Sequence, residues 1–173
     1  MAKSTSKSVL MVLAHSNFRD EEYTAARVRL EGAGAEVSVA STSSDGVSGS
    51  QGLQLNADLL IDDVNPDDYD AVVFIGGTGA SQYWHDVKAH AIAKSASERG
   101  KPVCASSHAA VTLAVAGLLN GKKVTGHIAI YEKLQVAGAD FTGSKLEQDG
   151  NIITSSGANA AREFGEALAR AIA

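Results

Sequence analysis

The chain has 173 residues, and its 15 Lys and Arg against 20 Asp and Glu leave a formal net charge of −5 with histidine neutral. This length and the 45% apolar content suit one domain over residues 1–173 with a sizeable core. The acidic balance argues against nucleic acid as the main partner, because phosphate neutralisation needs clustered Lys and Arg, and no apolar run approaches the ~20 residues that a membrane-spanning helix requires.

The first part of the chain alternates short β-type runs with a helical pattern. Residues 9–14 form a continuous apolar run, which is typical of a strand buried on both faces. Residues 19–32 predict a helix that ends near two glycines, and residues 37–40 predict a second strand. The Gly- and Ser-rich residues 46–52 predict a turn, and the alternation at residues 53–55 is consistent with a short edge strand.

The rest of the chain continues this alternation. Residues 71–75 are the most strand-like run, and the glycine-rich residues 76–79 follow it directly. The further predicted strands lie at residues 103–105, 122–125, 146–148 and 152–154. The predicted helices run from the glycine-rich stretch to about residue 98, from the end of the strand at 103–105 to residue 116, and from about residue 158 to 171.

The last predicted helix has one apolar face, made by Phe164, Leu168 and Ile172, which recur every four residues. Such a face is suited to packing against a sheet. Regular alternation of strands and helices predicts a mostly parallel sheet with helices on both sides. The sequence therefore predicts a single α/β domain.

In an open α/β sheet, sites form just beyond the carboxyl ends of the strands. That rule selects three segments, namely residues 15–22, 76–79 and 106–108. The first segment places Asp20, Glu21 and Glu22 in the first turn of a predicted helix. These carboxylates either interact with the helix dipole or include one that turns inward toward the other two segments.

The stretch Gly76-Gly77-Thr78-Gly79 can present bare backbone N–H groups to a ligand. It lacks the third glycine of a dinucleotide fingerprint, because position 82 is Gln, and the chain has no Walker sequence. We therefore expect no nucleotide or other cofactor. The pattern favours a loop whose N–H groups act as oxyanion donors.

Ser106, Ser107 and His108 lie where a predicted strand turns into a helix. This is the position of a nucleophile elbow, which exposes its central side chain and offers the next N–H group to an oxyanion. The full G-x-S-x-G pattern is absent, so a serine helix cap followed by an incidental histidine is the alternative. An elbow predicts a positive φ at Ser107, whereas ordinary helical or strand dihedral angles would favour the cap.

Other residues carry weaker signals. Cys104 is the one cysteine, so an intramolecular disulfide is excluded. A single free cysteine fits a reducing compartment, and we therefore expect a cytoplasmic protein. We expect Cys104 itself to be a buried strand residue. His15 either lines the cleft or caps a helix. Tyr83, Trp84 and His85 either wall the pocket or take part in a dimer contact or in helix packing. No Cys and His spacing is typical of a metal site, so we expect no metal.

A set of segments spread over residues 9–171 is similar, in the same order, to one known family. The segments are residues 18–22, 67–77, 100–103, 116–125, 149–155 and 163–168. They resemble the ThiJ/PfpI superfamily, which includes intracellular protease I and the parkinsonism-associated protein deglycase and chaperone. The resemblance implies a flavodoxin-like three-layer sandwich with a mostly parallel central sheet. It also implies a homodimer or a higher oligomer of dimers.

The resemblance assigns roles to individual positions. The family's nucleophilic cysteine falls on Ser107, which is either natural here or an engineered replacement, and the family's acid falls on Glu22. Gly76 and Gly77 match a glycine pair that would form an oxyanion pocket with the N–H group of His108. The His108 side chain matches a histidine of the protease-like branch.

His127 is similar to a site-lining histidine of some members, and we expect His15 in the same pocket. The resemblance implies glyoxalase, deglycase, hydratase or amidase chemistry on small carbonyl or acyl substrates, in which Ser107 attacks, Glu22 positions it and His108 transfers the proton. Serine in the nucleophile position favours the alternative of a non-catalytic stress-response, chaperone-like or ligand-sensing relative. In both cases Ser107 should lie within hydrogen-bond reach of Glu22.

Overall fold

A seven-stranded sheet forms the centre of the fold, which a computed structural model describes for residues 6–173. Residues 1–5 of the predicted domain lie outside the described part. Every neighbouring pair in this sheet is parallel except the last two strands of the chain. The order across the sheet is β11 (Leu146–Asp149), β12 (Ile152–Ser155), β8 (Val103–Ser106), β7 (Ala71–Phe74), β1 (Ser8–Val12), β3 (Glu36–Ser41) and β6 (Leu59–Leu60).

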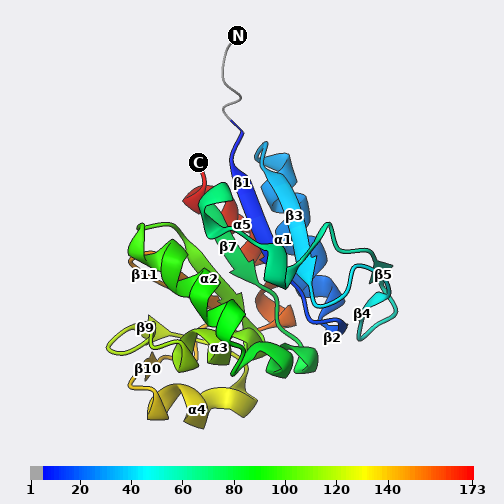
Figure 1. The fold of residues 1–173 in the computed structure, drawn as a ribbon. Coiled ribbons are helices and arrows are strands. Elements are labelled where there is room, and N and C mark those ends of the chain that lie inside the picture. The colour runs from blue at the N-terminus through cyan, green and yellow to red at the C-terminus, as the bar shows by residue number, and fades with distance from the viewer. Residues whose placement is uncertain (1–5) are drawn as a thin grey trace.

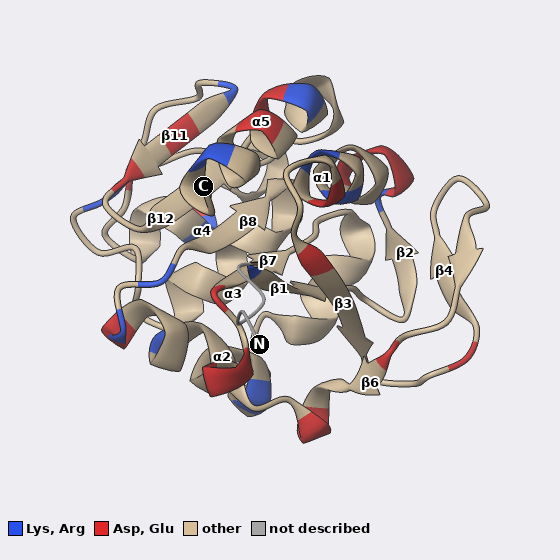
Figure 2. Ribbon diagram, turned by 90° about the horizontal axis from the view of Figure 1, so that it is seen from above, with Lys and Arg blue, Asp and Glu red and all other residues tan. Residues whose placement is uncertain are grey.

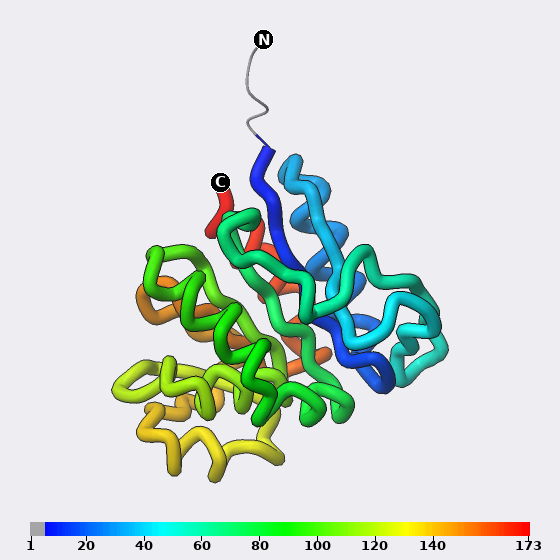
Figure 3. The backbone as a smooth tube through the Cα atoms, in the orientation of Figure 1, coloured from blue at the N-terminus to red at the C-terminus, as the bar shows by residue number. Residues whose placement is uncertain are grey.

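Helices cover both faces of the sheet (Figure 1). They are α1 (Asp20–Gly32), α2 (Val87–Glu98), α3 (Ala110–Val115) and α5 (Ala161–Ala171), while α4 (Tyr131–Val136) packs against α3. Figure 2 shows α1 and α5 on one face and α2 and α3 on the other, and the backbone tube in Figure 3 follows the same layers. The predicted three-layer α/β sandwich with a mostly parallel sheet is therefore confirmed. No helix within residues 6–173 is long and apolar enough to cross a membrane.

The central sheet separates two apolar layers. Leu10 and Val12 of β1 belong to the layer that includes α2 and α3, whereas Val9 and Met11 belong to the layer that includes α1 and α5. Neighbouring side chains on a strand point to opposite faces. A strand with a helical layer on each side must therefore be apolar at every position, which is the pattern that residues 9–14 show.

A small second sheet lies beside the end of β1. It is formed by β2 (Ser16–Phe18), β4 (Val47–Gly49) and β5 (Gln54–Leu55), so the predicted turn at residues 46–52 contains a short strand. Asp20 fixes the turn between β4 and β5 to the start of α1, because its carboxylate accepts the N–H groups of Gln51 at 3.2 Å and Leu53 at 2.9 Å.

The helix predicted to end at residue 98 is two helices. The chain after β7 forms a short 3₁₀ helix, η3 (Thr78–Tyr83), and α2 begins only at Val87. The Asp86 side chain accepts the N–H group of Ala89 at 2.7 Å and so caps α2. The break therefore has a local cause, since an aspartate cap starts a new helix.

The strand predicted at residues 122–125 does not join the central sheet. It is β9 (Lys123–Val124), which pairs with β10 (Asp140–Phe141) in a separate two-stranded sheet. The sequence did not predict β10 or α4. Segments of two and six residues are too short to show a hydrophobic period.

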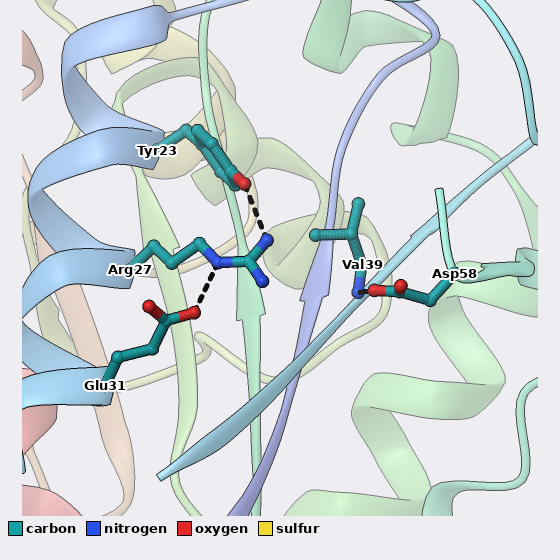
Figure 4. A network of polar contacts seen from close by, with 5 residues as sticks. All are labelled: Tyr23, Arg27, Glu31, Val39 and Asp58. Carbon is teal, nitrogen blue, oxygen red and sulfur yellow. Dashed lines mark hydrogen bonds and ion pairs between the residues drawn. The ribbon is translucent and has the colours of Figure 1, made fainter. Parts of the chain in front are cut away.

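Polar contacts support α1 and the strand next to it (Figure 4). Arg27 donates to the hydroxyl of Tyr23 at 2.7 Å and to the carboxylate of Glu31 at 2.6 Å, so it links successive turns of α1. Asp58 accepts the N–H group of Val39 at 2.8 Å, which ties β3 to the segment before β6.

Helices α1 and α5 approach each other closely at Gly165. A Cβ atom there would lie 2.8 Å from the carbonyl oxygen of Ala25 and 2.9 Å from Cγ of Arg29. Because the nearer of these neighbours is backbone, the helices would have to separate to accept a side chain. Glycine is therefore required by the helix contact itself.

We predict that Gly165→Ala lowers the free energy of unfolding by about 1–3 kcal/mol, the usual range for overpacking. The matched control is Gly32→Ala at the end of α1, where a Cβ atom would meet no other atom within 4 Å. That change should be neutral or stabilise by up to about 1 kcal/mol. Urea unfolding measures both, and equal effects of the two substitutions would contradict the assignment of Gly165 to a close helix contact.

Candidate active site

Ser107 lies at the turn between β8 and the short 3₁₀ helix η4 (Ser107–Ala109). Its φ is 44°, and Asn17 is the only other non-glycine residue within 6–173 with a positive φ. This conformation is unfavourable for a residue with a Cβ atom, and such residues cluster at functional sites. Ser106, at the N-cap position of η4, makes no capping hydrogen bond through its side chain. The positive φ that an elbow predicts is confirmed, and the side-chain cap of the alternative is not found.

The hydroxyl of Ser107 is buried and hydrogen-bonded on two sides. Its Oγ donates to Oε1 of Glu22 at 2.8 Å and accepts the N–H group of Gly77 at 3.1 Å. Glu22 lies in the first turn of α1 and Gly77 follows β7, so three distant chain segments meet at one oxygen atom. The predicted hydrogen-bond reach between Ser107 and Glu22 is confirmed.

The two glycines after β7 make room for this contact. A side chain at Gly76 would collide with Oγ of Ser107 and with the carbonyl oxygen of Ser106. Gly77 has a φ of 104°, a region that favours glycine. The N–H group of Gly76 donates to Oγ of Ser106 at 2.9 Å. Both predicted oxyanion donors of the glycine pair therefore bond to serine hydroxyls.

Glu22 is 3% exposed. Burial raises the pKa of its carboxyl above the usual value, because the cost of desolvation outweighs the hydrogen bonds with Ser106 and Ser107 and the attraction of Arg19. Glu22 therefore binds a proton at a higher pH than an exposed glutamate, and it is a stronger base once ionised.

A cavity of about 420 Å³ lies at Ser107. This volume is in the range that holds a small molecule. The lining is mostly polar and consists of Arg19, Glu22, Ser50, Gly77, Thr78, Ser107, His108, His127, Ser156, Gly157, Ala158 and Asn159. The structure thus brings five of the predicted site residues to one cavity: Glu22, Gly77, Ser107, His108 and His127.

The two cavity histidines stack on each other. The ring centroids of His108 and His127 are 4.3 Å apart, with an angle of 23° between the planes. Burial lowers the pKa of His108, and the neighbouring imidazole of His127 makes a smaller contribution in the same direction. The ring of His108 is therefore neutral near pH 7. Nδ1 of His108 is buried and has no hydrogen-bond partner within the described residues. His108 is therefore in the form that can accept a proton.

His15 lies apart from this cavity. Its Nε2 lies 3.2 Å from the carbonyl oxygen of Asp45, in the loop before β4. Strand β2 intervenes between His15 and α1 and directs the imidazole toward that loop. The expectation that His15 lines the pocket is corrected by this placement.

Tyr83, Trp84 and Cys104 pack outside the lining. The Tyr83 hydroxyl donates to the carbonyl oxygen of Leu13 at 2.8 Å, and Nε1 of Trp84 donates to that of His108 at 2.9 Å. Cys104 is fully buried in β8, and burial raises the pKa of its thiol. Over residues 6–173, no group of three or more His, Cys, Asp or Glu side chains is placed to hold a metal ion.

Seven lining residues were not singled out from the sequence as members of a site. Residues 156–159 follow β12, so the rule of carboxyl strand ends could have found them. Thr78 lies within the glycine-rich stretch that the same rule selected. Arg19 and Ser50 reach the cavity through β2 and the turn after β4, short elements whose positions depend on tertiary contacts.

Comparisons with known proteins agree on one family. A model of the DJ-1/PfpI family matches residues 7–171. An uncharacterized protein of Methanocaldococcus jannaschii, MJ0967, is 39% identical over 167 residues, which cover 95% of this chain and 82% of that protein. Deglycase TK1284 of Thermococcus kodakarensis is 35% identical over 146 residues, which cover 84% of this chain and 88% of that protein. The crystal structure of a ThiJ/PfpI domain protein from Brachyspira murdochii matches with a TM-score of 0.93 and 30% identity over 96% of both chains.

We predict that Ser107→Cys creates a thiol that iodoacetamide alkylates well below pH ~8.5, the value for an unperturbed cysteine. The reason is that the Gly77 N–H group donates to the atom at this position, and a hydrogen bond to the charged form lowers the pKa of a thiol. Alkylation rates against pH, with the label located by peptide mapping, measure this. Cys104 is the internal control and should react slowly. An introduced thiol that labels no faster than Cys104 would show that the site does not stabilise an anion.

We also predict a pH-dependent gain in stability for Glu22→Gln. The folded-state pKa of Glu22 is raised, so its contribution to stability is fully present below the unfolded pKa and is lost as pH rises through the folded pKa. The amide never ionises. The free energy of unfolding of the variant relative to the parent should therefore increase from pH 4 to pH 8. Urea unfolding of both proteins at each pH measures the difference, and a constant or falling difference contradicts the burial effect.

Proposed function

This chain belongs to the DJ-1/PfpI family, and we propose that it is an enzyme that acts on small carbonyl or acyl compounds with Ser107 as the nucleophile. The observation that carries this proposal is the 2.8 Å hydrogen bond from the Ser107 hydroxyl to Glu22, made by a residue with a φ of 44°. The cavity of about 420 Å³ supports a small substrate.

Glu22 is the group best placed to activate the hydroxyl. In its ionised form the carboxylate takes the proton of Ser107 while Oγ forms a bond to the carbonyl carbon of the substrate. The electron pair of the carbonyl double bond moves to the substrate oxygen. The raised pKa of Glu22 favours this step, since a stronger base accepts the proton more readily.

The substrate oxygen then carries negative charge and needs a donor. The N–H group of His108 is the first after the nucleophile, and the first N–H groups of a helical segment have no partner within it. A 2-oxo aldehyde such as methylglyoxal is held at this stage as a hemiacetal. The proton on the former aldehyde carbon then moves, through a base of the cavity, to the neighbouring carbonyl carbon, and water releases the resulting 2-hydroxy acyl group from Ser107 as a 2-hydroxy acid. An acyl compound instead loses its leaving group, which takes the proton that Glu22 received from Ser107, and water releases the acyl group.

The relatives support a reaction of this class. TK1284 is named a deglycase, and a Bacillus subtilis relative at 33% identity, YraA, is named a putative cysteine protease. A protease cleaves an acyl bond, which is a reaction of the class proposed for Ser107. Transfer of that chemistry to this chain requires the serine hydroxyl to replace the cysteine thiol.

A second candidate function is ligand binding without turnover, as in a stress-sensing or chaperone-like protein. It is favoured by the Ser107 hydroxyl itself, which already bonds to both Glu22 and Gly77. A serine is also a weak nucleophile unless a neighbouring base is ionised. The two functions differ in whether the cavity consumes a substrate.

We predict that the protein consumes methylglyoxal, a small aldehyde, or p-nitrophenyl acetate, a small ester, faster than buffer does. Ser107→Ala should reduce the rate to that of buffer, because the attacking atom is lost. Glu22→Gln should lower kcat by about 10²–10⁴-fold, the usual loss when a general base is removed. Initial rates followed by absorbance measure both.

The matched control is Cys104→Ala, which removes the one thiol of the chain but nothing from the cavity lining. This variant should keep the parent rate. If Cys104→Ala loses activity while Ser107→Ala keeps it, the nucleophile is wrongly assigned. Absence of turnover in the parent with both compounds favours the binding function.

A further inference from the structure

Ser106, the residue before Ser107, also points toward Glu22. Side chains of β8 alternate between the two apolar layers, and Cys104 lies in the layer that includes α1, whereas Ala105 lies in the other. Ser106 therefore points to the same side as Cys104, toward α1, whose first turn holds Glu22. The Ser106 side chain is fully buried and forms a hydrogen bond with the Glu22 carboxyl. Glu22 thus contacts the hydroxyls of two successive serines.

The glycine pair fixes the direction of these hydrogen bonds. The N–H group of Gly76 donates to Oγ of Ser106 at 2.9 Å. In the same way, the N–H group of Gly77 donates to Oγ of Ser107 at 3.1 Å. A backbone N–H group can only donate, so each serine oxygen is the acceptor toward its glycine, and the one proton of each hydroxyl is left for Glu22. Two glycines, two serines and one carboxyl therefore form one polarised network.

This network is complete when Glu22 is ionised. A carboxylate only accepts hydrogen bonds, so it can accept the protons of both hydroxyls. A protonated carboxyl must instead donate to one of the serines, which then has to turn its own proton away. Within residues 6–173, the hydrogen-bond partners of each serine hydroxyl are Glu22 and a glycine N–H group, which cannot accept that proton. The hydrogen bonds therefore favour the ionised carboxyl and oppose the effect of burial.

We propose that Ser106 is a positioning residue, whose hydroxyl orients the Glu22 carboxylate and stabilises its ionised form for removal of the Ser107 proton. Ser106 is not part of the cavity lining, so it acts through Glu22. It keeps donating to Glu22 while the carboxylate takes the proton of Ser107, and it gives up no proton of its own. This inference rests on the proposed function for its reaction, whereas the ionisation of Glu22 can be measured without turnover.

The first experiment follows the ionisation of Glu22 directly. Carbon-13 NMR of protein with labelled glutamate carboxyl groups records their titration, and Glu22→Gln identifies the Glu22 signal by its disappearance. In Ser106→Ala the titration midpoint of Glu22 should move to higher pH than in the parent, because one hydrogen bond to the charged form is lost. An unchanged midpoint in the folded variant would overturn the inference.

Ser155→Ala is the matched control. Ser155 lies opposite Ser106 in the pairing of β12 with β8 and is equally buried, but its hydroxyl has no hydrogen-bond partner within residues 6–173. This variant should leave the midpoint of Glu22 unchanged, and a shift equal to that of Ser106→Ala would reject a specific role for Ser106. Ser106→Cys replaces the hydroxyl with a weak donor of similar size. It should shift the midpoint in the same direction, which keeps the test available if Ser106→Ala does not fold.

The second experiment measures turnover against pH. The rise of kcat/KM for p-nitrophenyl acetate with the ionisation of Glu22 should move to higher pH in Ser106→Ala. On the acidic side of this rise the loss should be at least about 10-fold, as expected for a hydrogen bond to a charged group, and it should become smaller as pH increases. Loss of the contact with Gly76 alone would instead lower the rate equally at every pH.

The other charged or titratable groups that act on Glu22 or share its cavity remain in every Ser106 variant, and they are Arg19, Glu21, His108 and His127. A shift therefore reports the lost hydroxyl. Turnover by the parent, with the same pH profile and the same Glu22 midpoint in Ser106→Ala, would overturn the inference and leave the proposed function intact. A shifted midpoint without turnover of either p-nitrophenyl acetate or methylglyoxal by the parent would support the action of Ser106 on Glu22 and reject the proposed function.

Discussion

A serine held at a φ of 44° costs about 1–3 kcal/mol, and the surrounding structure must supply the contacts that keep it there. Strand β8 pairs with β7 on one side and β12 on the other, and a glycine follows each neighbour, Gly76 and Gly157. A side chain at Gly76 would collide with the Ser107 hydroxyl, and Gly157 has a φ of 142°, a region that favours glycine. The strained turn at Ser107 therefore depends on the two glycines beside it, and the geometry of the cavity depends on all three residues.

The chemistry of the site follows from how this turn is surrounded. It directs the hydroxyl of Ser107 away from solvent and toward Glu22, which is itself buried by the packing of α1 against the sheet. Burial makes the carboxyl costly to ionise, so Glu22 is either a proton donor or a strong base depending on pH. Arg19, three residues earlier, limits that cost through its charge. The start of α1 thus supplies both the acid–base group and the electrostatic field around it.

Much of this site could be predicted from the sequence, because it follows from topology. The rule that sites form at carboxyl strand ends selected the segments that hold Glu22, Gly77, Ser107 and His108, and the apolar runs located the strands themselves. Two errors share one cause, which is that local pattern does not report tertiary direction. His15 lies in a selected segment, but β2 turns it toward Asp45, and β9 and β10 are short strands without a period that pair outside the central sheet. The break before α2 is different, because it depends on the local cap that Asp86 makes.

The central claim is that Glu22 makes the hydroxyl of Ser107 nucleophilic. A fluorophosphonate tests it most directly, since an active serine displaces fluoride and forms a stable bond to phosphorus, which needs no knowledge of the substrate. Intact-mass spectrometry and peptide mapping should find a single adduct on Ser107 in the parent protein and a much slower reaction in Glu22→Gln. An unlabelled Ser107, or equal labelling rates in the two proteins, would contradict the claim.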